Sequence, residues 1–233
     1  MSELVAFTHA GTTFDIYIAR PTGAGPHPTV LVFHAFGGRD EFAEKQARRL
    51  TELGYLAGAV DLYGLGVRGK DRDSSSQLMD NLLNDPSELR GRIAAAVDAA
   101  LRVEGVDATR VGAIGFCFGG LCAILGARMG LNLRGVASFH GLLKLLEPLD
   151  AKPKARLLVL HGQDDPMVPA EDVAQFSKEM QRIEADWQLH AYSGVVHSFT
   201  NPAAQDAELG TVYDPEAQRR SWRAMERFFA DVM

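Results

Sequence analysis

A cysteine that could act as a nucleophile lies between two glycines, in the run Gly115-Phe116-Cys117-Phe118-Gly119. The spacing is that of a nucleophile elbow, G-x-S-x-G, with cysteine in the place of serine. In such an elbow a sharp turn between a strand and a helix presents the nucleophile, and the glycines let the two elements approach closely. The positive N-terminal end of the following helix would favour the thiolate of Cys117. The alternative is an inert cysteine buried in a packed turn.

A nucleophile of this kind needs a base and an acid that orients the base. In hydrolases with an elbow the chain order is nucleophile, acid, histidine. Asp164 and Asp165 follow the apolar run 157–160, and spacing does not choose between them, because one could cap the turn before the next proline. His197 lies in a long loop after both aspartates. We expect it to be the base, and the alternative is a surface-loop histidine.

An attacked carbonyl oxygen becomes negatively charged and needs two N–H donors. One is expected to be the N–H of Phe118, directly after the nucleophile. The other should come from the loop after the apolar run 29–33, where two glycines at 37–38 suit a close backbone approach. Phe36 is the predicted donor, with Ala35 as the alternative.

Three further histidines, His34, His140 and His161, each close a predicted strand. Histidines at strand ends often bond only backbone groups, so we expect structural support from them, although they could add polarity to a pocket. Cys122 lies among leucine, alanine and isoleucine and is expected to pack in the core.

The hydrophobic pattern predicts the elements that must position these residues. Two runs, 4–9 and 14–19, flank a short glycine-containing turn and predict a hairpin. Later runs are apolar at almost every residue, which suits strands of a parallel sheet covered on both faces. They lie at 29–33, 56–60, 111–116, 135–139 and 157–160, and a last strand is expected around 187–192.

Helical periodicity fills the stretches between the strands. The helical patterns cover 42–53, 89–101, 173–183 and a last segment at 214–232. Asp85, Pro86 and Glu88 supply the second helix with a cap, a first-turn proline and a capping-box acid. Alternating strands and helices predict one α/β domain over residues 1–233, with a mostly parallel central sheet, an N-terminal antiparallel hairpin and helices on both faces.

Two long segments, 64–84 and 193–213, show no regular pattern. Both follow predicted strands, and in open parallel sheets ligands bind beyond the carboxyl ends of the strands. The two segments are therefore candidate walls of a pocket. The alternative is that both are solvated surface loops.

Composition narrows the class of protein. The chain has 233 residues, a net charge of -6 and two cysteines. The acidity argues against a nucleic-acid partner, and two closely spaced cysteines form no disulfide framework and indicate a reducing compartment. Neither a signal peptide nor an apolar run of the ~20 residues that a membrane helix needs is evident. We therefore expect a cytoplasmic protein with no membrane partner.

The motifs together resemble the dienelactone hydrolases of the α/β-hydrolase fold, over nearly the whole chain. The resemblance rests on Asp61-Leu62-Tyr63-Gly64, the elbow at 115–120, Asp165-Pro166-Met167-Val168-Pro169, His197-Ser198-Phe199-Thr200-Asn201 and the closing segment 213–222. It implies an α/β-hydrolase fold and selects Asp165 as the acid. It also implies a Cys117–His197–Asp165 triad and hydrolysis of an ester or a lactone.

Two positions depart from the family pattern. Ala35 stands where many members carry glutamate. Thr200-Asn201-Pro202 stands where the dienelactone enzymes proper carry an arginine that helps to hold the substrate carboxylate. Arg68, Lys70 or Arg72 could supply a positive charge instead.

We therefore expect a hydrolase of small-molecule esters or lactones in which the Cys117 thiolate forms a thioester, with no metal and no organic cofactor. The residues expected around the pocket are His34, Ala35, Tyr63, His140 and Phe199. The expected assembly is a monomer or a homodimer. Two alternatives belong to other classes: a protein that binds a small molecule without turnover, and a redox-sensing thiol protein.

Overall fold

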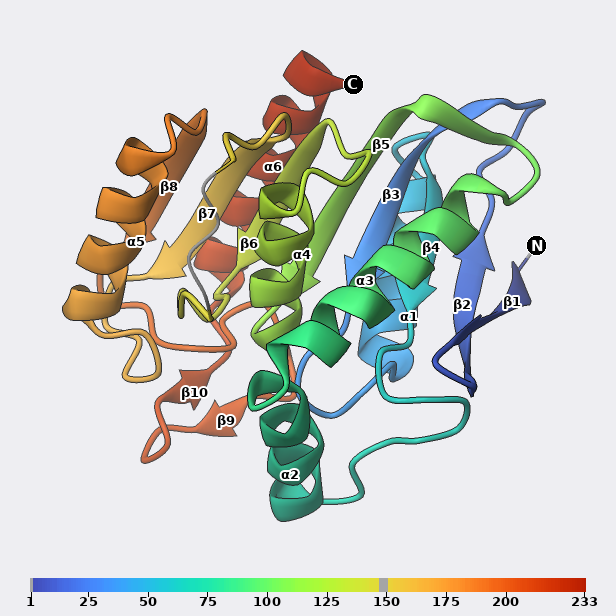
Figure 1. Cartoon of the computed structure of the whole chain (residues 1–233). Helices are drawn as coiled ribbons and strands as arrows, with labels where there is room; N and C mark the ends of the chain where they lie inside the picture. The colour runs from blue at the N-terminus through green and yellow to red at the C-terminus, as the bar shows by residue number, and fades with distance from the viewer. Residues whose placement is uncertain (1, 147–150) are drawn as a thin grey trace.

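The computed structural model describes residues 2–146 and 151–233, and an eight-stranded sheet forms its centre (Figure 1). The strand order is β1-β2-β4-β3-β5-β6-β7-β8. The strands are β1 (Ser2–His9), β2 (Thr12–Ala19), β3 (His27–Phe33), β4 (Leu56–Val60), β5 (Val106–Phe116), β6 (Gly135–Phe139), β7 (Arg156–Gly162) and β8 (Trp187–Tyr192). β2 is antiparallel to both β1 and β4, and every later neighbouring pair is parallel. The prediction of a mostly parallel sheet with an N-terminal antiparallel hairpin is confirmed.

The described part of the chain forms six helices. They are α1 (Glu41–Thr51), α2 (Arg72–Leu83), α3 (Pro86–Leu101), α4 (Phe118–Arg128), α5 (Ala170–Arg182) and α6 (Pro215–Val232). Within residues 2–146 and 151–233, no helix combines the length and the apolar character needed to cross a membrane.

Helices cover both faces of the sheet, which explains why its central strands are apolar at nearly every position. Along β3, Val30 and Val32 belong to the core cluster that also contains buried residues of α1 and α6. Leu31 and Phe33 belong to the opposite cluster, which contains buried residues of α3, α4 and α5. In Figure 1, α3, α4 and α5 lie in front of the sheet, with α1 and α6 behind it.

Local capping explains where two of the helices begin. The Asp85 side chain accepts a hydrogen bond from the N–H of Glu88 at 3.0 Å, and Asp214 caps α6 by accepting from Ala217 at 2.7 Å. The first of these starts was predicted from Asp85 and Pro86, and the last helix was predicted to begin at 214. β5 begins at Val106, five residues before the predicted start at 111. The prediction missed its first half because these residues are polar and partly exposed and so form no apolar run.

The prediction that residues 64–84 are irregular is wrong for their second half, which is the helix α2. Asp71 and Ser74 form a capping box at its start. Ser75 and Leu82 are the buried residues of this helix, so its hydrophobic periodicity is weak. Residues 193–213 are largely irregular, with a small hairpin of β9 (Gln205–Asp206) and β10 (Thr211–Val212). Figure 1 shows α2 and this hairpin below the edge toward which the parallel strands point.

Candidate active site

Cys117 forms the turn between β5 and α4 in a strained backbone conformation. Its φ is 54° and its ψ is -118°, a region that residues with a side chain rarely adopt. Its N–H donates to the carbonyl of Phe139 on β6 at 3.2 Å, and its own carbonyl accepts from Gly120 at 2.9 Å. Hydrogen bonds to its N–H and to its carbonyl therefore hold Cys117 in this strained conformation, and such strain is typical of functional sites. The thiol is free, and the residue is 7% exposed.

The two glycines of the elbow are required by the approach of the helix to the sheet. A Cβ on Gly115 would lie 1.9 Å from the carbonyl oxygen of Gly119. A Cβ on Gly119 would lie 2.1 Å from the carbonyl oxygen of Phe33, at the end of β3. Both contacts are with backbone atoms, which cannot swing away as a flexible side chain could. The G-x-C-x-G spacing therefore reports the close packing of α4 on β3 and β5.

Asp165 and His197 form a buried hydrogen-bonded pair beside the elbow. The Nδ1–H of His197 donates to Oδ2 of Asp165 at 2.7 Å, and Oδ1 accepts from the N–H of Met167 at 2.8 Å. Both residues are almost fully buried. Asp164 is exposed, and its N–H donates to the carbonyl of Val195. Of the two aspartates that spacing left open, Asp165 therefore contacts the histidine.

Electrostatics favour a positively charged His197. Burial alone would lower its pKa, but the charge of Cys117 and the hydrogen bond to Asp165 outweigh burial and raise the pKa to about 10. The charge of Cys117 is the largest of the effects that raise this pKa, and Nε2 of His197 has no other hydrogen-bond partner among the described residues. A thiolate beside an imidazolium is the state in which a cysteine is a ready nucleophile.

The two predicted oxyanion donors are Phe118, which lies within the elbow, and Phe36, which lies in the loop after β3. Phe118 is the first residue of α4, where N–H groups have no partner within the helix. Phe36 lines the cavity at Cys117. The Tyr63 hydroxyl donates to the carbonyl of Phe36 at 2.8 Å, and the N–H of Gly38 donates to Ala35 at 3.2 Å, so the loop has a defined shape.

A cavity of about 330 Å³ opens at Cys117 and His197. Residues of both segments that were candidate pocket walls, 64–84 and 193–213, contribute to its lining. Its lining residues are Ala35, Phe36, Gly37, Asp40, Phe42, Arg72, Ser76, Met79, Phe116, Cys117, His140, Leu142, Met167, His197, Ser198, Asn201, Ala204, Leu209 and Thr211. The volume suits a small organic molecule.

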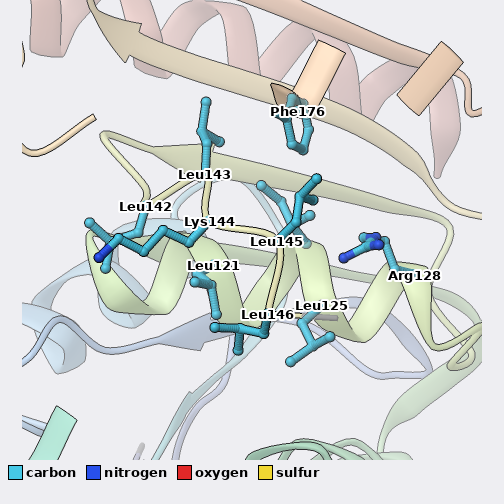
Figure 2. A pocket seen from close by; sticks show the side chains of 10 residues that line it. Leu121, Leu125, Arg128, Leu142, Leu143, Lys144, Leu145, Leu146 and Phe176 are labelled. Carbon is cyan, nitrogen blue, oxygen red and sulfur yellow. The ribbon is translucent and has the colours of Figure 1, made fainter. Parts of the chain in front are cut away.

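A second hollow shares Leu142 with the cavity at Cys117 (Figure 2). It is enclosed by leucines of α4 and of residues 142–146, with Phe176 facing it from α5. Its volume is about 10 Å³, room for little more than a water molecule. Its described lining contains no cysteine and no histidine, so the cavity at Cys117 and His197 is the candidate active site.

The model of the dienelactone hydrolase family matches residues 14–233. The chain belongs to the dienelactone hydrolase family. It is therefore a hydrolase that acts on ester or lactone bonds, and its sheet and helices are those of the α/β-hydrolase fold.

Individual proteins are similar to this chain over between 62% and 100% of its length. A dienelactone hydrolase-like promiscuous phosphotriesterase from metagenomic libraries has a TM-score of 0.94 and 34% identity, with 100% of this chain and 98% of that chain covered. A Bradyrhizobium protein named "Probable 2-oxo-3-(5-oxofuran-2-ylidene)propanoate lactonase" is 30% identical over 224 residues, which are 88% of this chain and 84% of that protein. An uncharacterized Caenorhabditis elegans protein is 37% identical over 149 residues, which are 62% of this chain and 94% of that protein.

In this member of the dienelactone hydrolase family, Ala35 and His140 line the cavity, whereas His34, Tyr63 and Phe199 lie behind the lining. This corrects the expectation that all five surround the pocket. His34 is fully buried; its Nδ1–H donates to the carbonyl of Ala35 at 2.6 Å, and its Nε2 accepts from Leu62 at 3.2 Å. Burial, with smaller effects of Arg68 and Arg39, lowers the pKa of His34 to about 4. A neutral His34 therefore supports the loop that carries Phe36.

The sequence offered Arg68, Lys70 and Arg72 as possible positive charges at the pocket without choosing among them. Arg68 lies 3.4 Å from Asp61 and donates to the backbone carbonyls of Arg39 and Val67, and Lys70 does not line the cavity. Arg72, at the start of α2, does line it. The capping pair Asp71 and Ser74 was the sequence signal for α2, and it would have placed Arg72 in the first turn of a helix beside the pocket.

Proposed function

We propose that the protein hydrolyses small carboxylic esters or lactones by covalent cysteine catalysis, with Cys117 as nucleophile, His197 as base and Asp165 as the residue that orients the base. One observation carries the proposal: the buried Asp165–His197 hydrogen bond lies in the same site as a strained elbow cysteine, and one cavity reaches both Cys117 and His197. This is the arrangement of roles found in the Ser-His-Asp triad, with a thiolate in place of the hydroxyl.

In the first half of the reaction, Sγ of Cys117 attacks the carbonyl carbon and forms a carbon–sulfur bond. The electron pair of the carbonyl moves to its oxygen, which the N–H groups of Phe118 and Phe36 would stabilise. When the oxyanion collapses, the ester carbon–oxygen bond breaks. Nε2–H of His197 gives its proton to the leaving alkoxide, and a thioester remains.

In the second half, water attacks the thioester. Nε2 of the now neutral His197 takes a proton from that water, and a second oxyanion forms in the same place. The carbon–sulfur bond then breaks, releasing the carboxylic acid and returning Cys117 to the thiolate. Asp165 fixes the tautomer of His197 throughout, because its carboxylate accepts from Nδ1–H.

We propose further that the preferred substrates carry a carboxylate. Apolar side chains such as Phe42, Met79 and Leu142 form much of the cavity wall, which suits a small organic acyl group. Apart from its histidines, the described lining contains one cationic side chain, that of Arg72. Its guanidinium has the planar donor geometry that pairs with a carboxylate.

The test is an activated aryl ester panel with wild-type protein, Cys117→Ala and, as the matched control, Cys122→Ala. Cys122 is fully buried and its pKa is raised well above the usual value by burial, so its loss should leave turnover intact. We expect Cys117→Ala to lose turnover while its circular-dichroism spectrum stays that of a folded protein. In wild type, we expect mass spectrometry to detect acylated Cys117. Full turnover by Cys117→Ala would refute the proposal. Ligand binding without product would favour a binding protein, and reversible oxidation of Cys117 without esterase activity would favour a redox sensor.

A second candidate activity is hydrolysis of phosphotriesters. It is favoured by the similarity, over 100% of this chain, to a promiscuous phosphotriesterase. Turnover of aryl phosphotriesters by wild type, and its loss in Cys117→Ala, would establish this activity at the same site. Turnover that survives in Cys117→Ala would place it elsewhere.

We also propose that the chain acts as one domain, as a monomer or a homodimer, in the cytoplasm. Both cysteines are free in the structure, which is compatible with a reducing compartment. Sedimentation of the purified protein would distinguish the two assemblies, and a single cooperative unfolding transition would support the single domain.

A further inference from the structure

His140 holds an unfavourable position directly after β6. Its φ is +38°, in the left-handed region, and the residue is 2% exposed. For a residue with a side chain, such a conformation costs about 1–3 kcal/mol and persists only when its surroundings impose it. The N–H of His140 donates to the carbonyl of Leu160 on β7 at 2.8 Å, which fixes its backbone to the sheet.

The imidazole of His140 has one hydrogen bond to a side chain. Nε2 lies 2.8 Å from Oγ1 of Thr200, three residues beyond His197 in the same loop. Nδ1 has no hydrogen-bond partner among the described residues. A buried polar atom without a partner destabilises a fold by about 1–3 kcal/mol. An apolar residue would therefore suit this position better if stability alone mattered.

The ring of His140 also packs edge-on against His197. Their ring centroids are 5.1 Å apart and the ring planes meet at 65°. Phe199 also packs edge-on against His140, with ring centroids 5.1 Å apart. Burial, reinforced by the charge of His197, lowers the pKa of His140 well below its ordinary value. A neutral imidazole therefore stands beside the ring that carries the proton.

Building on the proposed triad, we propose that His140 is a positioning residue for His197. It ties the loop of His197 to the end of β6 through Thr200, and its ring edge restricts rotation of the His197 ring. The other side of that loop is already fixed, because the N–H of His197 donates to Gly210 and its carbonyl accepts from Val212. The Thr200 contact supplies the remaining connection, between this loop and the strand next to the nucleophile.

The decisive variant is Thr200→Val, which removes the hydroxyl and keeps the shape of the side chain. We expect kcat to fall about 10- to 100-fold with little change in KM, because a small displacement of a catalytic group is enough for such a loss. Thr200→Ser keeps the hydroxyl and should restore most of the rate. Thr29→Val is the matched control: Thr29 is equally buried, in β3, and its hydroxyl donates to the carbonyl of His27.

A second readout separates positioning from general damage and from failure of the proposed function. The groups that act on His197 are Cys117, Asp165, His140 and His161. The rate at which iodoacetamide alkylates Cys117 reports the thiolate–imidazolium pair without any turnover. We expect the pH profile of this alkylation rate to shift in Thr200→Val and not in Thr29→Val.

The double variant His140→Phe/Thr200→Val should be no slower in alkylation or turnover than the slower of the two single variants, because both changes remove the same bond.

Two results would overturn the positioning role. One is Thr200→Val with wild-type kcat and a wild-type alkylation profile. The other is full additivity of the His140 and Thr200 changes. If Cys117→Ala keeps its esterase activity, the proposed function fails instead, and the alkylation profile still tests whether His140 positions His197.

Discussion

Oδ2 of Asp165 lies 2.7 Å from Nδ1 of His197, although the two residues are 32 positions apart in the sequence. The carboxylate comes from the turn after β7, and the imidazole comes from the loop between β8 and β9. Both groups are buried, so water does not compete for this bond. The bond leaves Nε2 of His197 as the nitrogen that can exchange protons with Cys117 and substrate.

Asp165→Asn should therefore inactivate the enzyme without unfolding it. The amide would present an N–H where Nδ1–H now donates and would favour the wrong tautomer of His197. In the serine triad the equivalent change lowers kcat by about 10,000-fold, and we expect a loss of similar order, measured with an aryl ester. Asp164→Asn is the control, because Asp164 is exposed and should tolerate the change. Similar activity of the two variants would remove Asp165 from the mechanism.

Gly119→Ala should unfold the elbow. Its Cβ would stand 2.1 Å from a backbone oxygen of β3, so α4 would have to move away from the sheet. We expect a loss of more than about 3 kcal/mol in the free energy of unfolding. Gly126→Ala, in the same helix, meets atoms no closer than 3.4 Å and should be neutral or stabilise by about 0.5–1 kcal/mol. Urea denaturation of both variants provides the comparison, and equal stability would contradict the packing argument.

The sequence predicted features that depend on local spacing and missed those that depend on how distant segments meet. The elbow is local, since Gly115, Cys117 and Gly119 are the residues that a strand, a turn and a helix require. α2 was missed because Ser75 and Leu82 are its buried residues, which leaves no clear periodicity. The contact between His140 and Thr200 joins residues 60 positions apart, and no pattern in the sequence signals it.

The difference between local spacing and contacts between distant segments also explains which pocket residues the sequence predicted. Strand order brings the residues after β3, β5, β6 and β7 to one edge, and alternation of strands and helices was enough to predict that edge. Which side chains then face the cavity depends on small turns. Tyr63 does not line the cavity, and its hydroxyl instead bonds the carbonyl of Phe36, whereas Arg72 lines the cavity from the first turn of a helix that was not predicted.

Arg72→Met should change which substrates are preferred. A hydrogen bond to a charged group contributes about 1.5–3 kcal/mol, so the ratio of kcat/KM for carboxylate-bearing over neutral esters should fall about 10- to 100-fold. Lys70→Met removes a cation that lies near Arg72 in sequence and does not line the cavity, and it should leave that ratio unchanged. Paired esters that differ only in the carboxylate provide the measurement. An unchanged ratio in Arg72→Met would show that the substrate carboxylate, if one is recognised, binds elsewhere.

The buried His34 should make the fold sensitive to acid. Its pKa is lowered from 6.5 to about 4 by burial, so between these values the unfolded chain binds a proton that the folded chain does not. Stability is therefore intact above pH 6.5 and is lost as the pH falls toward 4. Asp61 acts in the opposite direction, because burial raises its pKa from 3.8 to about 6.

Comparing His34→Gln with wild type isolates the histidine: the dependence of the free energy of unfolding on pH should be shallower in the variant between pH 6.5 and 4. His190→Gln changes an exposed histidine and should keep the wild-type slope. Equal slopes in wild type and His34→Gln would mean that His34 is not the neutral buried group whose protonation opposes folding.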